Sequence, residues 1–186
     1  MNLPNKLTVL RIFMIPIFLV VVSIPQGIWG ALEFSGVSLP VTHLVGAILF
    51  ALASFTDWLD GHLARKWHLV TNFGKFADPL ADKMLVMTAF IVLVQLGFVP
   101  GWVAAIIVCR ELAVTGLRLL LVEHGEVMAA AWPGKIKTAT QMFAIIFLFL
   151  HIAVIGQILL YVCLIATIYS GIDYFAKNAD VFKGSM

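Results

Sequence analysis

The sequence predicts an all-α integral membrane protein, built as a bundle of six transmembrane helices. Of its 186 residues, 62% are hydrophobic and only 12% are charged, whereas a soluble domain has about 25% charged residues. The mean hydropathy is +1.04. Six apolar runs approach the length that a helix needs to cross a bilayer, and they cover about residues 7–24, 41–56, 83–99, 102–122, 138–155 and 157–175. We expect a single domain over residues 1–186.

The first three apolar runs show how we expect such runs to form helices. The first run follows Lys6, as in a signal peptide, but no small-x-small cleavage site follows Ile24, so we expect a retained helix. The runs at 41–56 and 83–99 are near the short end of the spanning range. We therefore expect their helices to continue beyond the lipid on the charged side.

The charged residues are divided unequally between the two sides of this bundle. All twelve Lys and Arg lie in or toward one set of connections, and the opposite connections, at 23–40, 97–101 and 155–156, contain only Glu33 as a charged residue. The positive-inside rule then places both termini in the cytoplasm, as six spans require. We expect a multi-pass protein of the plasma membrane. A net charge of +2 does not argue for nucleic-acid binding.

Carboxylates are concentrated between the second and third runs. The stretch from Ser54 to Lys83 contains four of the ten acidic residues, Asp57, Asp60, Asp78 and Asp82. The first two are three residues apart and the last two are four apart, so each pair shares one face of a helix. If the two helices are antiparallel neighbours, the four carboxylates converge. They would repel one another unless a cation lay between them.

The ligand types favour a hard cation at this point. Carboxylate oxygens without Cys or convergent His favour Mg²⁺, Mn²⁺ or Ca²⁺ over zinc. Magnesium usually binds through few carboxylates together with substrate phosphates, which indicates a phosphate-bearing substrate. The small residues Gly61 and Ala64 follow on the same helix and would allow a ligand to approach the backbone.

The spacing of this stretch resembles the signature of the CDP-alcohol phosphotransferase family. The pattern is Asp57-x2-Asp60-Gly61-x2-Ala64-Arg65-x8-Gly74-x3-Asp78-x3-Asp82. The six spans and the cytoplasmic site also resemble the six-helix fold of that family. The resemblance implies a short N-terminal segment that lies along the membrane, and it implies a homodimer.

The resemblance also implies a reaction, in which an alcohol attacks the β-phosphorus of a CDP-linked lipid and releases CMP. One or two ions of Mg²⁺ or Mn²⁺ would be held by Asp57, Asp60, Asp78 and Asp82. Asp82 would be the general base that takes the hydroxyl proton. The CDP-lipid would contact Asn5, Thr8, Asp57, Gly61, Ala64, Arg65 and Gly74. Helix capping explains Asn5 equally well.

Basic residues further along the chain suggest the acceptor alcohol. Arg110 and Arg118 lie inside the fourth run, where an arginine facing lipid would be costly. Lys135 and Lys137 lie at the start of the fifth helix, where backbone N–H groups also favour anions. Together they predict an anionic acceptor, although positive-inside topology explains Lys137 as well. The same runs resemble those of family members that use sn-glycerol 3-phosphate.

The expected reaction is therefore the conversion of CDP-diacylglycerol and sn-glycerol 3-phosphate into phosphatidylglycerol phosphate and CMP. A synthase of the same family with another acceptor, such as inositol phosphate or serine, is the first alternative. A divalent-cation transporter would also use converging carboxylates, but the opposite side lacks polar residues for an exit path. Cys109 and Cys163 match no metal spacing, and we expect both to be buried small hydrophobes.

Overall fold

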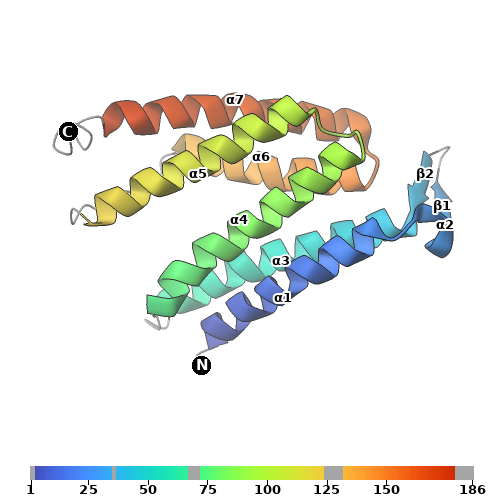
Figure 1. Cartoon of the computed structure of the whole chain (residues 1–186), viewed down its shortest axis with the longest axis horizontal. Coiled ribbons are helices and arrows are strands. Elements are labelled where there is room, and N and C mark those ends of the chain that lie inside the picture. Colours follow the sequence, from blue (N-terminus) through green and yellow to red (C-terminus); the bar gives the residue numbers. More distant parts are fainter. Residues whose placement is uncertain (1–2, 35–36, 67–71, 124–131, 179–186) are drawn as a thin grey trace.

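The computed structural model describes residues 3–34, 37–66, 72–123 and 132–178. This part of the chain is mostly helical and contains one antiparallel hairpin (Figure 1). The helices are α1 (Leu3–Ser23), α2 (Gln26–Trp29), α3 (Val41–Lys66), α4 (Asn72–Gln95), α5 (Gly101–Glu123), α6 (Trp132–Phe149) and α7 (Ala153–Lys177). The strands are β1 (Ala31–Phe34) and β2 (Val37–Pro40).

Each of the six apolar runs falls largely within one long helix. As expected from their short apolar runs, α3 continues past residue 56 to Lys66 and α4 begins well before residue 83, at Asn72. In the described residues, two segments are long and apolar enough to cross a membrane, Asn5–Ser23 and Ala153–Lys177. Three charged residues interrupt the apolar length of α5, namely Arg110, Glu111 and Arg118.

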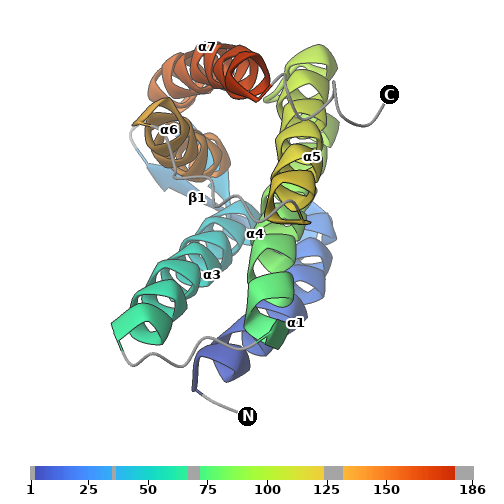
Figure 2. The same cartoon turned by 90° about the vertical axis from the view of Figure 1, so that its left-hand side faces the viewer.

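The long helices form two groups that meet along the middle of the molecule. Helix α1 packs against α3 and α4, while α6 packs along α7, which also contacts α5. Helix α3 joins the two groups through its contact with α6. Figures 1 and 2 show that the start of α1 and the end of α7 lie at the same end of the bundle, opposite the hairpin. Helices α3 and α4 run antiparallel, as predicted for the carboxylate-bearing pair.

Aromatic side chains form the centre of the core. Phe18, Phe50 and Phe149 are fully buried, and the Phe18 ring centroid lies 5.6 Å from that of Phe149 and 6.3 Å from that of Phe50. By contrast, large apolar side chains such as Ile91 and Ile165 are about two-thirds exposed, at 66% and 68%. An exterior this apolar is typical of a protein that is surrounded by lipid.

The connection between α6 and α7 differs from the expected position. We predicted a break at Ile155–Gly156, but α6 ends at Phe149 and residues 150–152 form the connection, where His151 has a left-handed φ of 58°. The Ile152 amide donates to the Phe147 carbonyl at 2.9 Å, which is a typical helix C-terminal bond. Gly156 instead lies inside α7. A Cβ at this position would be 2.7 Å from Leu148 Cδ2, so the close packing of Leu148 requires glycine here. It is a packing glycine and not a turn glycine.

Three further expectations are corrected by the structure. The all-α prediction missed the hairpin, in which Ala31 pairs with Pro40 and Phe34 with Val37. The predicted N-terminal segment is not a separate element, because α1 is continuous from Leu3, and its position along the membrane stays a prediction. Cys163 is buried as expected, but Cys109 is exposed, because it lies on an outer face of α5.

Candidate active site

The Asp57 carboxylate is held by a buried arginine from another helix. Arg11 of α1 is fully buried, and its Nη1 lies 2.6 Å from Asp57 Oδ1 on α3. The Arg11 Nε also donates to the Ala53 carbonyl at 3.3 Å. A charge buried this deeply needs such a partner. The ion pair therefore fixes one carboxylate oxygen of Asp57 and leaves the group one-third exposed.

Asp82 of α4 lies close enough to Asp57 for their charges to interact. Asp82 directly precedes the predicted span at 83–99 and is partly buried. Burial, and then the negative charge of Asp57, raise its pKa to about 6, against the opposing effect of Arg11, Lys83 and Lys137. Each of these two carboxylates disfavours the ionisation of the other, and a cation between them would relieve that repulsion. Their oxygen atoms are donors that suit a hard divalent cation.

The other residues of the predicted motif are only partly described. The backbone is helical through Asp57 and Asp60 in α3 and through Asp78 and Asp82 in α4, so each pair shares a helix face as predicted. For the other residues of the motif the structure describes only the helical backbone, namely for Asp60, Gly61, Ala64, Arg65, Gly74 and Asp78. Among the described residues, no group of three or more His, Cys, Asp or Glu forms a metal site.

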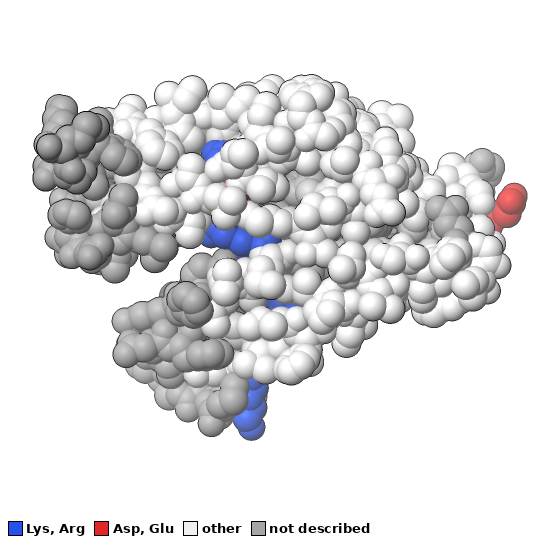
Figure 3. All heavy atoms as spheres, in the orientation of Figure 1, with Lys and Arg blue, Asp and Glu red and all other residues white. Residues whose placement is uncertain are grey.

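A cavity of about 530 Å³ opens beside this pair of carboxylates. Asp82, Lys83, Val86 and Met87 of α4 lie in its wall, and the rest of the wall comes from α5, α6 and Tyr174 of α7. Figure 3 shows Lys and Arg atoms in the hollow between the two groups of helices. All four basic residues that were predicted to bind the acceptor line this cavity: Arg110, Arg118, Lys135 and Lys137. The fold thus brings them together with Asp82 at one site.

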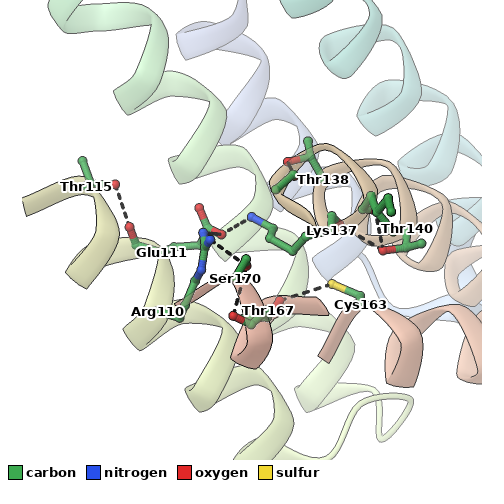
Figure 4. Close-up of polar contacts among 11 residues, drawn as sticks. Arg110, Glu111, Thr115, Lys137, Thr138, Thr140, Cys163, Thr167 and Ser170 are labelled. Carbon is green, nitrogen blue, oxygen red and sulfur yellow. Dashed lines mark hydrogen bonds and ion pairs between the residues drawn. The ribbon is translucent and has the colours of Figure 1, made fainter. Parts of the chain in front are cut away.

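Glu111 connects two of these basic residues (Figure 4). Its Oε1 accepts a hydrogen bond from the buried Lys137 and lies 3.4 Å from Arg110 Nη1. Arg110 Nη2 also donates to Ser170 Oγ at 2.8 Å. Both cations are therefore fixed in place by α5 and α7, and part of their charge is compensated within the protein.

Arg118 and Lys135 occupy more open positions. Both side chains are exposed in the cavity wall. The Lys135 ammonium lies 5.4 Å from the centroid of the Trp132 ring. These two cations are more accessible to an incoming anion than the buried Lys137.

The two predicted nucleotide contacts on α1 are buried. Asn5 is 9% exposed and Thr8 is fully buried, on the helix that packs against α3 and α4. Together with Arg11 they recur every three residues, so they form one polar stripe. This stripe directs α1 toward the carboxylate helices, and contact of Asn5 or Thr8 with a nucleotide stays a prediction.

Comparison with known proteins shows the family of the chain. The family model described as CDP-alcohol phosphatidyltransferase matches residues 1–169. The chain belongs to this family. The predicted resemblance is thereby confirmed, and the mostly helical fold is that of a membrane CDP-alcohol phosphatidyltransferase.

Named relatives within the CDP-alcohol phosphatidyltransferase family are similar over nearly the whole chain. A Bacillus subtilis CDP-diacylglycerol–glycerol-3-phosphate 3-phosphatidyltransferase is 51% identical, over 99% of this chain and 98% of that protein. A Rickettsia bellii protein of the same name is 37% identical over 97% of each chain. A probable phosphatidylglycerophosphate synthase of Mycobacterium tuberculosis H37Rv is 40% identical, over 95% of this chain and 81% of its own.

Several residues that lie around the carboxylate pair and the cavity were not predicted from sequence. Arg11 contributes to the charge asymmetry of the sequence, and its position one turn after Thr8 inside an apolar run is the one local signal of a further role. Ser170 and Tyr174 gave no signal, because their roles depend on α7 packing beside α5. Glu111 directly follows Arg110 in the fourth apolar run, but its contact with Lys137 depends on α6 packing beside α5.

Proposed function

We propose that the chain transfers the phosphatidyl group of CDP-diacylglycerol to sn-glycerol 3-phosphate, giving phosphatidylglycerol phosphate and CMP. The observation that carries the proposal is the shared position of Asp82, which belongs both to the carboxylate pair and to the wall of the cationic cavity. The names of the full-length relatives support the same substrates. A cavity with several Lys and Arg residues fits an acceptor that carries its own phosphate.

The proposed roles follow from this arrangement. The acceptor phosphate binds Arg118 and Lys135, with Arg110 and Lys137 as the anchored cations behind them. The acceptor's terminal hydroxyl forms the new O–P bond at the β-phosphorus, the bond from that phosphorus to CMP breaks, and the hydroxyl proton goes to Asp82. Asn5, Thr8, Gly61, Ala64, Arg65 and Gly74 are proposed to contact the CDP-lipid.

Divalent ions complete the proposed site. Asp57, Asp60, Asp78 and Asp82 would hold one or two ions of Mg²⁺ or Mn²⁺. Such an ion would neutralise the pyrophosphate and the charge that develops on CMP. The described residues fit this assignment through the hard oxygen donors of Asp57 and Asp82 and through the charge repulsion that raises the pKa of Asp82.

We further propose six membrane crossings, with both termini and the site on the cytoplasmic side of the plasma membrane. Support comes from the six long helices and from the charge asymmetry, with Glu33 at the hairpin end. A homodimer is proposed from family membership alone. Cysteine accessibility in intact and opened spheroplasts tests the orientation, and crosslinking in native membranes tests the dimer.

The direct test of function is CMP release from CDP-diacylglycerol with a panel of acceptors. Glycerol 3-phosphate should support release, whereas inositol phosphate and serine should give little. Preference for another acceptor would replace the proposed substrate while keeping the reaction. Divalent-cation flux in proteoliposomes, without CMP release, would favour the transporter alternative.

Arg118→Ala is expected to raise the KM for glycerol 3-phosphate by about 10- to 100-fold, the loss expected for one hydrogen bond to a charged group. The KM for CDP-diacylglycerol should change by less than about twofold. Lys177→Ala is the matched control, because Lys177 is 68% exposed outside the cavity and pairs with Asp173. Equal changes in both KM values would argue against an acceptor role for Arg118.

Chelation is expected to stop CMP release and added Mg²⁺ or Mn²⁺ to restore it, because the carboxylates cannot neutralise a pyrophosphate. The measurement is the initial rate of CMP release in EDTA, followed by titration with each ion. Release that persists in excess EDTA would contradict the metal assignment.

A further inference from the structure

Gln141 of α6 has an unusual environment for a buried amide. The residue is 3% exposed, and its Nε2 is buried without a hydrogen-bond partner in the described part of the protein. Buried side-chain amides nearly always have a partner, because an unpaired donor loses its hydration without compensation. Gln141 also lines the cavity that contains Asp82. Gln141 therefore brings a buried, unpaired donor to the wall of a space that a ligand can fill.

The position of Gln141 along the cavity distinguishes it from the cations. It follows Lys137 by four residues, so it lies on the same face of α6 one turn further from the charged end. Its cavity neighbours include the apolar side chains of Val86, Val114 and Met142. Gln141 is thus an uncharged polar group one turn beyond Lys137. The phosphate of the acceptor would already be bound by other residues, Arg118 and Lys135.

A second glutamine shows how a purely structural amide is treated in this fold. Gln157 of α7 donates from Nε2 to the Phe98 carbonyl at 2.6 Å, outside the cavity. That bond ties α7 to the connection before α5. Gln141 makes no comparable bond through its Nε2 within the described residues, so no bond of this kind ties it to a neighbouring helix.

We propose that Gln141 binds the non-reacting hydroxyl group of the acceptor, and so selects a polyol phosphate over a simple alkyl phosphate. This inference rests on the proposed function. In sn-glycerol 3-phosphate the terminal hydroxyl reacts and the phosphate binds the cations, which leaves the middle hydroxyl in need of a partner. A hydroxyl both accepts and donates, so it complements a carboxamide. Gln141 is therefore a specificity residue, distinct from the phosphate ligands.

The test compares two acceptors that differ only in the middle hydroxyl, glycerol 3-phosphate and 3-hydroxypropyl phosphate. Gln141→Met keeps the length of the side chain and removes its polar atoms. We expect this variant to lose about tenfold in kcat/KM for glycerol 3-phosphate, the loss of one hydrogen bond, and less than about twofold for 3-hydroxypropyl phosphate. Gln157→Met, the matched control, should change both values by the same factor.

Thermal unfolding of the detergent-solubilised protein gives an independent readout. Because Gln141 Nε2 has no described protein partner, Gln141→Met should leave the midpoint unchanged or raise it, whereas Gln157→Met should lower it. A lower midpoint for Gln141→Met, or equal loss of kcat/KM for both acceptors, would show a structural role and overturn the inference.

The two proposals fail in different ways. If the wild-type protein releases no CMP with glycerol 3-phosphate, the proposed function is wrong and the inference falls with it. If the wild-type protein uses glycerol 3-phosphate and Gln141→Met keeps the wild-type ratio between the two acceptors, only the inference is wrong.

Discussion

Asp82→Asn is expected to lower kcat by about 10²- to 10⁴-fold, the usual contribution of a general base, without lowering the stability of the metal-free protein. Asp82 is partly buried beside Asp57, and these two factors raise its pKa to about 6. A neutral amide removes the repulsion between the two groups, so the folded state loses nothing by the change. The measurements are single-turnover CMP release and the thermal midpoint in EDTA.

Asp173→Asn is the matched control for this change. Its carboxylate lies 2.8 Å from the exposed Lys177 ammonium and does not line the cavity, so activity should stay within about twofold. Exposed pairs of this kind contribute little to stability. Wild-type turnover in Asp82→Asn would remove Asp82 from the proposed chemistry, and a lower midpoint would show that its charge is stabilising.

Asp57→Ala is expected to abolish CMP release and also to destabilise the fold. Arg11 is fully buried and would lose the carboxylate that lies 2.6 Å from it. Breaking a fully buried ion pair costs about 3–5 kcal/mol. Because Asp57 itself is one-third exposed, we expect about 2–3 kcal/mol. Chemical denaturation in mixed micelles measures the free energy of unfolding, and CMP release measures the activity.

The double change Arg11→Met/Asp57→Leu separates these two effects. Replacing both partners of a buried pair by apolar residues is often neutral for stability, so the free energy of unfolding should recover while CMP release stays absent. The exposed pair Asp173 and Lys177 provides the control, because Asp173→Leu/Lys177→Met should alter neither quantity appreciably. Recovery of activity in the double variant at Arg11 and Asp57 would mean that Asp57 has only a structural role.

The carboxylate motif could be predicted from sequence because its geometry is local. Spacings of three and four residues place two side chains on one helix face whatever surrounds the helix. Only the helical state of two segments was needed, and α3 and α4 are helical at these positions. The apolar runs were equally informative about the long helices, since helix length follows from bilayer thickness.

Helix ends and polar partners were less predictable. The sequence predicts a turn at Gly156, because glycine is common in turns. Gly156 lies inside α7 instead, where the close approach of Leu148 leaves no room for a Cβ. His43 Nδ1 lies 2.8 Å from His151 Nε2, although 108 residues separate them. Such contacts depend on which helices become neighbours, and no local pattern specifies that.

Composition and short spacings were enough to predict the family, the helical composition, the charged and neutral ends, and the faces that carry the aspartates. The packing of the helices decided that Arg11 pairs with Asp57, that Glu111 anchors Arg110 and Lys137, and that Gln141 lines the cavity with an unpaired donor. The Arg11–Asp57 and Glu111–Lys137 pairs join different helices. Their energies come from burial and pairing, which exist only once the helices have packed.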